Sequence, residues 1–208
     1  MNNKKMVGFI SLGLFLCFSA LACQTERAQT QVFGNRIPRS YFVTWGQGES
    51  DVTTHAGSYD DALRMAKIEN FNILTYSSIL PPEAVEIPIP PPEAMHHGAV
   101  LESISAVADG TQGETITAGI TWARVKRKSD GQILGGFVAE YHGKDSKEKA
   151  EENLRQALEG IFARRYRPEE YELHDQKILV KSFVPTKKFG TVIVLLGFTD
   201  YIFPGIKN

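Results

Sequence analysis

A pair of serines, Ser77-Ser78, offers the most distinctive chemistry in this sequence. The pair follows an apolar segment and precedes the double proline Pro81-Pro82. The hydroxyl of Ser78 could attack the carbonyl of Ser77, so that an N-to-O acyl shift gives an ester. Elimination would then release an upstream chain ending at Ser77 and leave dehydroalanine at position 78, which hydrolyses to a pyruvoyl group and ammonia. From the pattern alone, an ordinary strand followed by a loop is the favoured interpretation.

Two further polar residues could support a reaction at this pair. Asn72 lies shortly upstream, and its amide could donate to the Ser77 carbonyl as an oxyanion develops there. Glu140 lies in the apolar segment 135–141. A carboxylate in such surroundings needs partners or acquires a raised pKa, and a raised pKa suits a proton donor. Composition alone favours a simpler interpretation, in which Glu140 ends a strand and faces water.

Asp60 and Asp61 are adjacent carboxylates that also allow two interpretations. They would lie in the first turn of a helix capped by Ser58, where negative charge is favourable. In a cleft, a carboxylate could instead pair with a guanidinium or ammonium group. The spacing does not choose between these roles.

Several common functional patterns are missing from the sequence. His96-His97 would point to opposite faces of an extended chain, and no carboxylate cluster accompanies them, so no metal site is predicted. The Gly-x-Ser-x-Gly pattern of many hydrolases is absent. The formal net charge is −1 with both signs interspersed, so nucleic acid is not an expected partner.

The N-terminus is typical of an exported protein. Lys4 and Lys5 precede an uncharged run that ends in a lipobox-like segment, Ser19–Cys23. We expect residues 1–23 to be a signal peptide of the lipoprotein type, with lipidation and membrane attachment at Cys23 and localisation in the cell envelope or periplasm. The run falls short of the roughly 20 apolar residues of a spanning helix, which disfavours an uncleaved anchor. A cytoplasmic protein is the alternative if the leader is not used.

The remaining chain predicts a polar tether at 24–38 and one domain at 39–208. With 208 residues and 42% hydrophobic content, the chain can bury one core. We expect a turn-rich loop at 46–57 and a central strand at 71–76. The hairpin signals favour an α+β fold with sheet packed on sheet and helices outside. The expected helices are at 59–69 and after Ser146, and the other expected strands are at 41–45, 99–108, 115–125, 133–141, 177–184 and 190–197.

Taken together, several short segments resemble the pyruvoyl-dependent arginine decarboxylases, and they occur in family order over roughly residues 40–198. The phrases at 66–72 and 134–136 are most similar to the chlamydial-type branch. The resemblance implies a four-layer αββα sandwich, self-cleaved into a β chain to residue 77 and an α chain from residue 78. It also implies a homotrimer with sites between protomers. The segments that carry it are Ala62-Leu63, Asn72-Ile73-Leu74, Ser77–Ala84, Gly98-Ala99-Val100, Gly113–Ile116 and Ala139–Gly143.

The resemblance also implies a role for each candidate residue. Ser78 would become the covalent pyruvoyl cofactor, and Asn72 would assist the cut. Asp60 would contact the guanidinium of L-arginine, with Leu63 nearby. Glu140 would act as the general acid while a Schiff base to the pyruvoyl group loses CO2 and yields agmatine. The alternatives are a pyruvoyl decarboxylase for another amino acid and a non-enzymatic, lipid-anchored envelope binding protein on the same fold.

Overall fold

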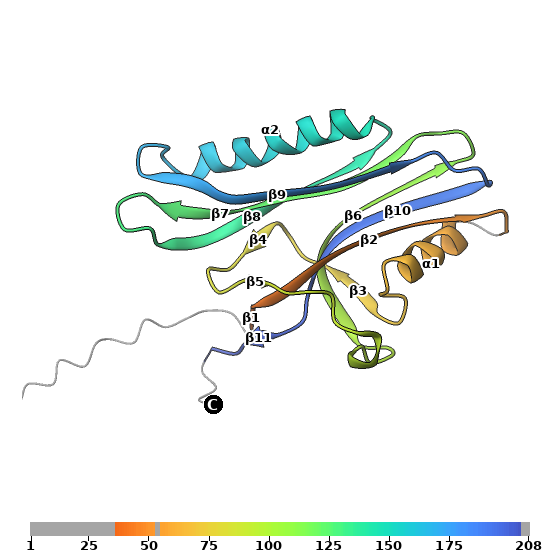
Figure 1. The fold of residues 1–208 in the computed structure, drawn as a ribbon, viewed down its shortest axis with the longest axis horizontal. Helices are drawn as coiled ribbons and strands as arrows, with labels where there is room; N and C mark the ends of the chain where they lie inside the picture. Colours follow the sequence, from red (N-terminus) through yellow and green to blue (C-terminus); the bar gives the residue numbers. More distant parts are fainter. Residues whose placement is uncertain (1–35, 53–54, 205–208) are drawn as a thin grey trace, which may run out of the picture. The chain divides into compact units, whose positions relative to one another are not determined.

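The computed structural model describes residues 36–52 and 55–204 (Figure 1). The expected signal peptide, the lipidation at Cys23 and residues 24–35 of the expected tether lie outside the described residues. Within the described part of the chain, no helix combines the length and apolarity that crossing a membrane requires.

Two main sheets form the framework of the domain, and most of their strand pairs are antiparallel. In the five-stranded sheet the order is β3-β6-β10-β2-β5, in which β3–β6 and β2–β5 are parallel. In the four-stranded sheet the order is β4-β8-β7-β9. A small pair, β1 with β11, joins the two ends of the domain. The strand bounds are β1 Ile37–Pro38, β2 Ser40–Ser50, β3 Asn72–Thr75, β4 Ile79–Leu80, β5 Val85–Glu86, β6 Val100–Thr111, β7 Ile116–Arg127, β8 Ile133–Gly143, β9 Tyr171–Phe183, β10 Phe189–Phe198 and β11 Tyr201–Ile202.

The two sheets pack face to face, and one long helix covers the outer face of each (Figure 1). Helix α1 (His55–Met65) packs on the five-stranded sheet, and α2 (Lys147–Arg165) packs on the four-stranded sheet. A short 3₁₀ helix, η1 (Pro92–Ala94), lies in the proline-rich connection before β6. The predicted α+β sandwich with its helices outside is therefore confirmed.

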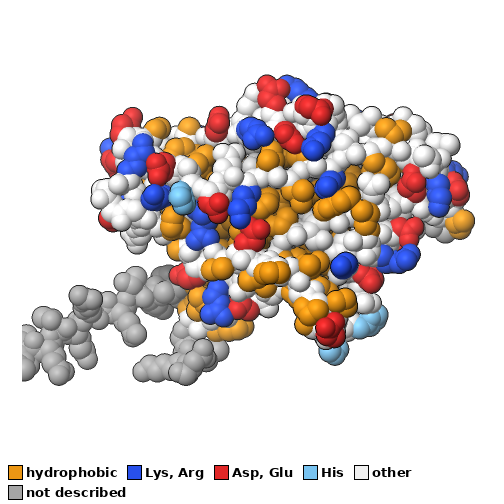
Figure 2. Space-filling model, in the orientation of Figure 1, with side chains coloured by type: hydrophobic (Ala, Val, Ile, Leu, Met, Phe, Trp, Pro, Cys, Tyr) orange, Lys and Arg blue, Asp and Glu red, His pale blue; other side chains and the backbone are white. Residues whose placement is uncertain are grey.

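Alternation along β7 shows how the sequence builds these layers. Ile116 and Trp122 face the other sheet and belong to the central core, whereas Ala123 and Val125 face α2. Neighbouring residues of a strand point to opposite faces, so one apolar strand serves two cores. Acidic and basic side chains intermingle over α2, while apolar side chains gather in the middle of the same view (Figure 2).

Helix α1 begins earlier than the sequence predicts, so Ser58 is not its N-cap. The helix starts at His55, and the hydroxyl of Ser58 donates to the His55 carbonyl 3.0 Å away. The same hydroxyl lies 2.8 Å from the hydroxyl of Thr191 on β10. Ser58 is thus a fully buried polar contact between helix and sheet. Ser146, in contrast, caps α2 as predicted, because its side chain accepts from the backbone N–H of Lys149.

The expected loop after residue 45 is instead the second half of β2. A side chain at Gly46 would overlap the carbonyl oxygen of Ala62, and one at Gly48 would overlap that of Ser58. These glycines therefore allow α1 to lie directly against the strand, rather than turn the chain. The prediction for 71–76 was also wrong in position, because β3 is an edge strand and not a central one.

Candidate active site

Ser77 and Ser78 lie where the chain crosses from one sheet to the other. Just before them, β3 pairs with β6, and the N–H of Tyr76 donates to the Ser103 carbonyl at 2.7 Å. Just after them, β4 pairs with β8. The carbonyl of Ser78 itself accepts from the N–H of Val138 at 3.0 Å. The Ser77–Ser78 peptide bond is therefore held at both ends by different sheets.

A glycine on β8, Gly135, makes room for β4 beside this crossing. Gly135 has φ +122°, a conformation that other residues rarely adopt. A Cβ at this position would lie 2.7 Å from the carbonyl oxygen of Leu80. Leu80 pairs with Gly136 and is almost fully buried. Gly135 thus lets β4 approach β8 closely and so fixes the position of Ser78, which directly precedes β4.

The side chains of Ser78 and Glu140 contact each other across this strand pair. The Ser78 hydroxyl donates to the two carboxylate oxygens of Glu140, at 3.1 and 3.3 Å. These residues are far apart in sequence, and the pairing of β4 with β8 brings them together. The arrangement places a proton acceptor directly on the hydroxyl that the sequence offers as a possible nucleophile.

Glu140 has a side chain that reaches solvent, yet protein atoms surround it closely enough to perturb its ionisation. Partial burial raises the pKa of the Glu140 carboxyl, because desolvation disfavours the charged form. The hydrogen bonds from Ser78 and from its own backbone, and the nearby His142, act in the opposite direction but do not cancel this effect. A carboxyl with a raised pKa keeps its proton to higher pH, as a general acid requires.

A backbone donor that the sequence did not reveal points at the Ser77 carbonyl. The N–H of Ile79 donates to the carbonyl oxygen of Ser77 at 3.0 Å, closing a three-residue turn centred on Ser78. Negative charge would develop on this oxygen if the Ser78 hydroxyl attacked the Ser77 carbon. A turn of this kind leaves no side-chain signature, so only its position before the double proline could have suggested it.

Asn72 makes a different contact from the one expected. Its amide donates to the carbonyl oxygen of Gly98 at 2.9 Å, where β3 begins beside β6. Among the described residues, no hydrogen bond joins the Asn72 side chain to Ser77 or Ser78. Its contribution to a cut therefore stays a prediction.

Asp60 and Leu63 both lie on α1, on the outer side of the five-stranded sheet. Asp60 is exposed, whereas Leu63 is only 7% exposed and packs in the core beneath the helix. In the described part of the chain, no hydrogen bond or ion pair connects Asp60 to Ser78 or Glu140. Within one chain the structure therefore does not bring Asp60 to the serine pair.

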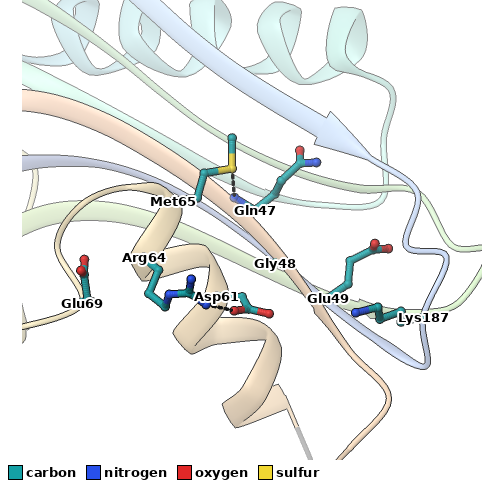
Figure 3. Close-up of a pocket in the computed structure, with 8 residues that line it drawn as sticks. All are labelled: Gln47, Gly48, Glu49, Asp61, Arg64, Met65, Glu69 and Lys187. Carbon is teal, nitrogen blue, oxygen red and sulfur yellow. Dashed lines mark hydrogen bonds and ion pairs between the residues drawn. The ribbon is translucent and has the colours of Figure 1, made fainter.

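An open pocket of about 610 Å³ lies beside α1, between the helix and the end of β2 (Figure 3). Asp61 and Arg64 form an ion pair of 2.9 Å in its wall, and Met65 accepts from the backbone N–H of Gln47. Neither Ser78 nor Glu140 lines it. The pocket is thus separate from the serine pair in this chain, and its lining residues are Gln47, Gly48, Glu49, Asp61, Arg64, Met65, Glu69 and Lys187.

Comparison with known proteins gives a consistent assignment. The family model for pyruvoyl-dependent arginine decarboxylase matches residues 40–203. The pyruvoyl-dependent arginine decarboxylase AaxB of Chlamydia muridarum is 34% identical over 192 residues, covering 81% of this chain and 94% of that protein. The enzyme of the same name from Chlamydia abortus is 40% identical over 122 residues, covering 52% and 61% of the two chains.

A relative from another organism carries the same name. The pyruvoyl-dependent arginine decarboxylase of Methanocaldococcus jannaschii is 38% identical over 122 residues, covering 58% of this chain and 68% of that one. The family match spans nearly the whole described domain, from the first residue of β2 to just beyond β11. The chain therefore belongs to the pyruvoyl-dependent arginine decarboxylase family of lyases, as the resemblance in its sequence predicted.

Proposed function

We propose that this chain cuts itself between Ser77 and Ser78 and then decarboxylates L-arginine to agmatine and CO2. The observation that carries the proposal is the contact of the Ser78 hydroxyl with Glu140, at the point where the chain crosses between sheets. The printed names of the relatives support the reaction and its substrate.

The contacts around the serine pair support each step of the cut. Glu140 accepts the hydroxyl proton as the Ser78 oxygen bonds to the Ser77 carbon, and the Ile79 N–H stabilises the negative carbonyl oxygen. The carbon–nitrogen bond between the serines breaks as the nitrogen takes up that proton, which gives the ester and a free amino group on residue 78. Loss of the Cα proton of residue 78 then expels the Ser77 carboxylate and leaves dehydroalanine. Addition of water and loss of ammonia complete the pyruvoyl group.

The residues around position 78 fit such a group. A pyruvoyl group at this position would supply an electron sink for the decarboxylation of a bound amino acid. The Val138 N–H holds the carbonyl of residue 78, so the position of the reacting carbon is fixed by β8. Glu140 contacts the Ser78 side chain, so its carboxyl lies close to residue 78. Because its pKa is raised, this carboxyl can supply the proton that replaces CO2.

We propose that Asp60 binds the substrate guanidinium in a homotrimer whose sites lie between protomers. Asp60 does not face Ser78 of its own chain, so a second protomer is needed to bring such a carboxylate to the site. An exposed apolar surface near the serine pair supports an assembly. Leu74 on edge strand β3 is 47% exposed, Val100 beside it is 60% exposed, and Ile79 is 46% exposed. Burying such a surface against another protomer would be favourable.

Intact mass measurement tests the function most directly. We expect two fragments, one ending at Ser77 and one beginning with a pyruvoyl group at position 78. Purified chain should release CO2 from arginine, and Ser78→Ala should stay uncut and inactive. A single uncut polypeptide after incubation would refute the proposal. Release of CO2 from a different amino acid, but not from arginine, would retain the chemistry and change the substrate.

We also propose that the protein is exported and lipidated at Cys23, because of the leader described above. Labelled palmitate should be incorporated into the chain and lost in Cys23→Ala. Unlabelled protein in the cytoplasmic fraction would favour the alternative, in which the leader is not used.

A further inference from the structure

Arg36 makes a cluster of contacts upstream of the serine pair. Its guanidinium forms an ion pair with Glu102 on β6 and donates to the hydroxyl of Tyr76 at 3.4 Å. It also lies over the ring of Tyr201, 5.5 Å from the ring centre. Arg36 falls in the segment predicted to be a tether, yet it contacts the residue that directly precedes Ser77.

The burial of Glu102 explains why its ion pair with Arg36 is important for the position of β3. The residue is only 4% exposed, and its backbone pairs with Leu74 of β3. A buried carboxylate is costly unless a cation accompanies it, and Arg36 supplies that cation. Since Arg36 contacts both Glu102 and Tyr76, it ties the end of β3 to β6 through side chains as well as through the backbone.

Arg124 makes a corresponding set of contacts downstream of the pair. This residue lies on β7, in the four-stranded sheet. Its guanidinium donates to the carbonyl of Pro82 at 2.5 Å and to the carbonyl of Ala84. These carbonyls belong to the loop that follows β4, so Arg124 fixes the segment that leads away from Ser78.

We propose that Arg36 and Arg124 are positioning residues, each holding one side of the Ser77–Ser78 bond for self-cleavage. The proposal rests on the self-cleavage described above. Arg36 fixes the carbonyl side of the bond through β3, and Arg124 fixes the nucleophile side through β4 and its loop. Neither guanidinium takes part in bond making. Both define the distance between the attacking oxygen and the carbonyl carbon.

The two arginines then differ in their importance after the cut. Ser77 becomes a chain end, so the alignment that Arg36 provides has no further use at the reacting atoms. Residue 78 remains beside Glu140, so the alignment that Arg124 provides is needed during decarboxylation as well. Loss of Arg36 should therefore slow cutting alone, whereas loss of Arg124 should slow both reactions.

Arg36→Met tests the upstream half, with Arg39→Met as its matched control. Arg39 lies three residues further along the chain and pairs with Asp200, and among the described residues no hydrogen bond or ion pair joins its side chain to β3. We expect Arg36→Met to cut on the order of tenfold to a hundredfold more slowly, because small misplacements of reacting groups have effects of this size. Activity per pyruvoyl group, measured after the cut reaches completion, should equal that of the unsubstituted chain. Arg39→Met should behave like the unsubstituted chain in both measurements.

Arg124→Met tests the downstream half, with Lys126→Met as its control. Lys126 is on the same strand and pairs with Glu172, away from the loop. Arg124→Met should reduce both the cutting rate and the turnover number per pyruvoyl group, and Lys126→Met should reduce neither. If a methionine variant fails to fold, the conservative changes Arg36→Lys, Arg124→Lys and Tyr76→Phe are measured, with intermediate slowing expected.

The possible outcomes separate this inference from the proposed function. If the unsubstituted chain does not cut, the function fails first. If it cuts, and the arginine variants cut at its rate while remaining folded, the positioning roles are wrong. Equal losses of activity per pyruvoyl group in Arg36→Met and Arg124→Met would also overturn the division between them.

Discussion

Gly135→Ala should separate β4 from β8 and so disturb the serine pair from a distance. At φ +122° an alanine experiences backbone strain of about 1–3 kcal/mol. Its Cβ would also lie 2.7 Å from the Leu80 carbonyl oxygen, so β4 must move by several tenths of an ångström. Weakening one hydrogen bond of this pair costs about 1 kcal/mol. Alanine also lowers the conformational entropy of the unfolded chain, which stabilises the folded state by about 0.4–1 kcal/mol. The net expected loss in unfolding free energy is about 1–4 kcal/mol.

Gly131→Ala is the matched control for this change. Gly131 also has a positive φ, of +73°, but an added Cβ would meet only the side chain of Lys126 at 3.7 Å. Its cost should therefore be limited to backbone strain of about 1–2 kcal/mol, reduced by the same entropy effect of about 0.4–1 kcal/mol. Denaturant unfolding of both variants in a Ser78→Ala background gives the free energies without interference from cutting. Each kcal/mol corresponds to about 2–4 °C in melting temperature for a chain of this size.

The cutting rate completes the test of this reasoning. In the chain that retains Ser78, Gly135→Ala should slow cutting by about tenfold or more, because β4 directly follows the nucleophile Ser78 and holds it in place. Gly131→Ala lies in the distant turn between β7 and β8 and should leave the rate unchanged. If the two variants are equally stable and cut equally fast, Gly135 does not position β4 as described.

Three further predictions concern groups at the site. Glu140→Gln should cut slowly, and it should fail to supply a proton during decarboxylation. In the unsubstituted enzyme, the turnover number should fall as the pH rises through the raised pKa of Glu140, and a pH–rate profile measures this fall. The pKa of Glu140 is higher in the folded state than in the unfolded state, so protonated Glu140 stabilises the fold fully at low pH. This stabilisation is lost as the pH rises through the folded-state pKa. The unfolding free energy of Glu140→Gln should therefore depend less on pH in this range. Replacing the Ile79 amide by an ester removes the donor to Ser77 and should slow cutting on the order of a hundredfold to a thousandfold; an unchanged rate by time-resolved mass analysis would exclude this donor. Asp60→Ala should weaken arginine binding by about 2 kcal/mol or more, and unchanged arginine kinetics would remove it from the guanidinium site.

The sequence predicted the layers of the fold better than its details. Apolar periodicity located the main strands and both helices, because burial on one face dominates these segments. The sequence-based prediction was wrong about residues 46–50, because glycines such as Gly46 and Gly48 are typical of turns. Their actual function is close contact with a helix that lies elsewhere in the sequence. The prediction placed β3 in the centre of a sheet because a central strand and an edge strand that another protomer could cover have the same apolar pattern.

The site was predicted in part, and mostly through resemblance. Residue types alone left Ser78 and Glu140 with ordinary interpretations, because the pairing that joins them depends on a contact between distant strands. The Ile79 donor could not be predicted, since it belongs to the backbone. Arg36 and Arg124 were missed because an arginine that binds buried carboxylates or carbonyls has no local signature. Asp60 remains a prediction that requires a second protomer.

Strand β2 comes from the part of the chain before Ser77, yet it lies between β10 and β5, which both come from the part after Ser78. Its ten residue pairs with β10 would survive the cut, so the two fragments should remain together in the native protein. Once denatured, however, a cut protein can refold only when two separate molecules meet. Its recovery should therefore depend on protein concentration, whereas an uncut chain should refold at a rate independent of concentration. The self-cleavage step would thus convert a reversible folding reaction into a bimolecular assembly, and dilute protein that unfolds after maturation should be lost.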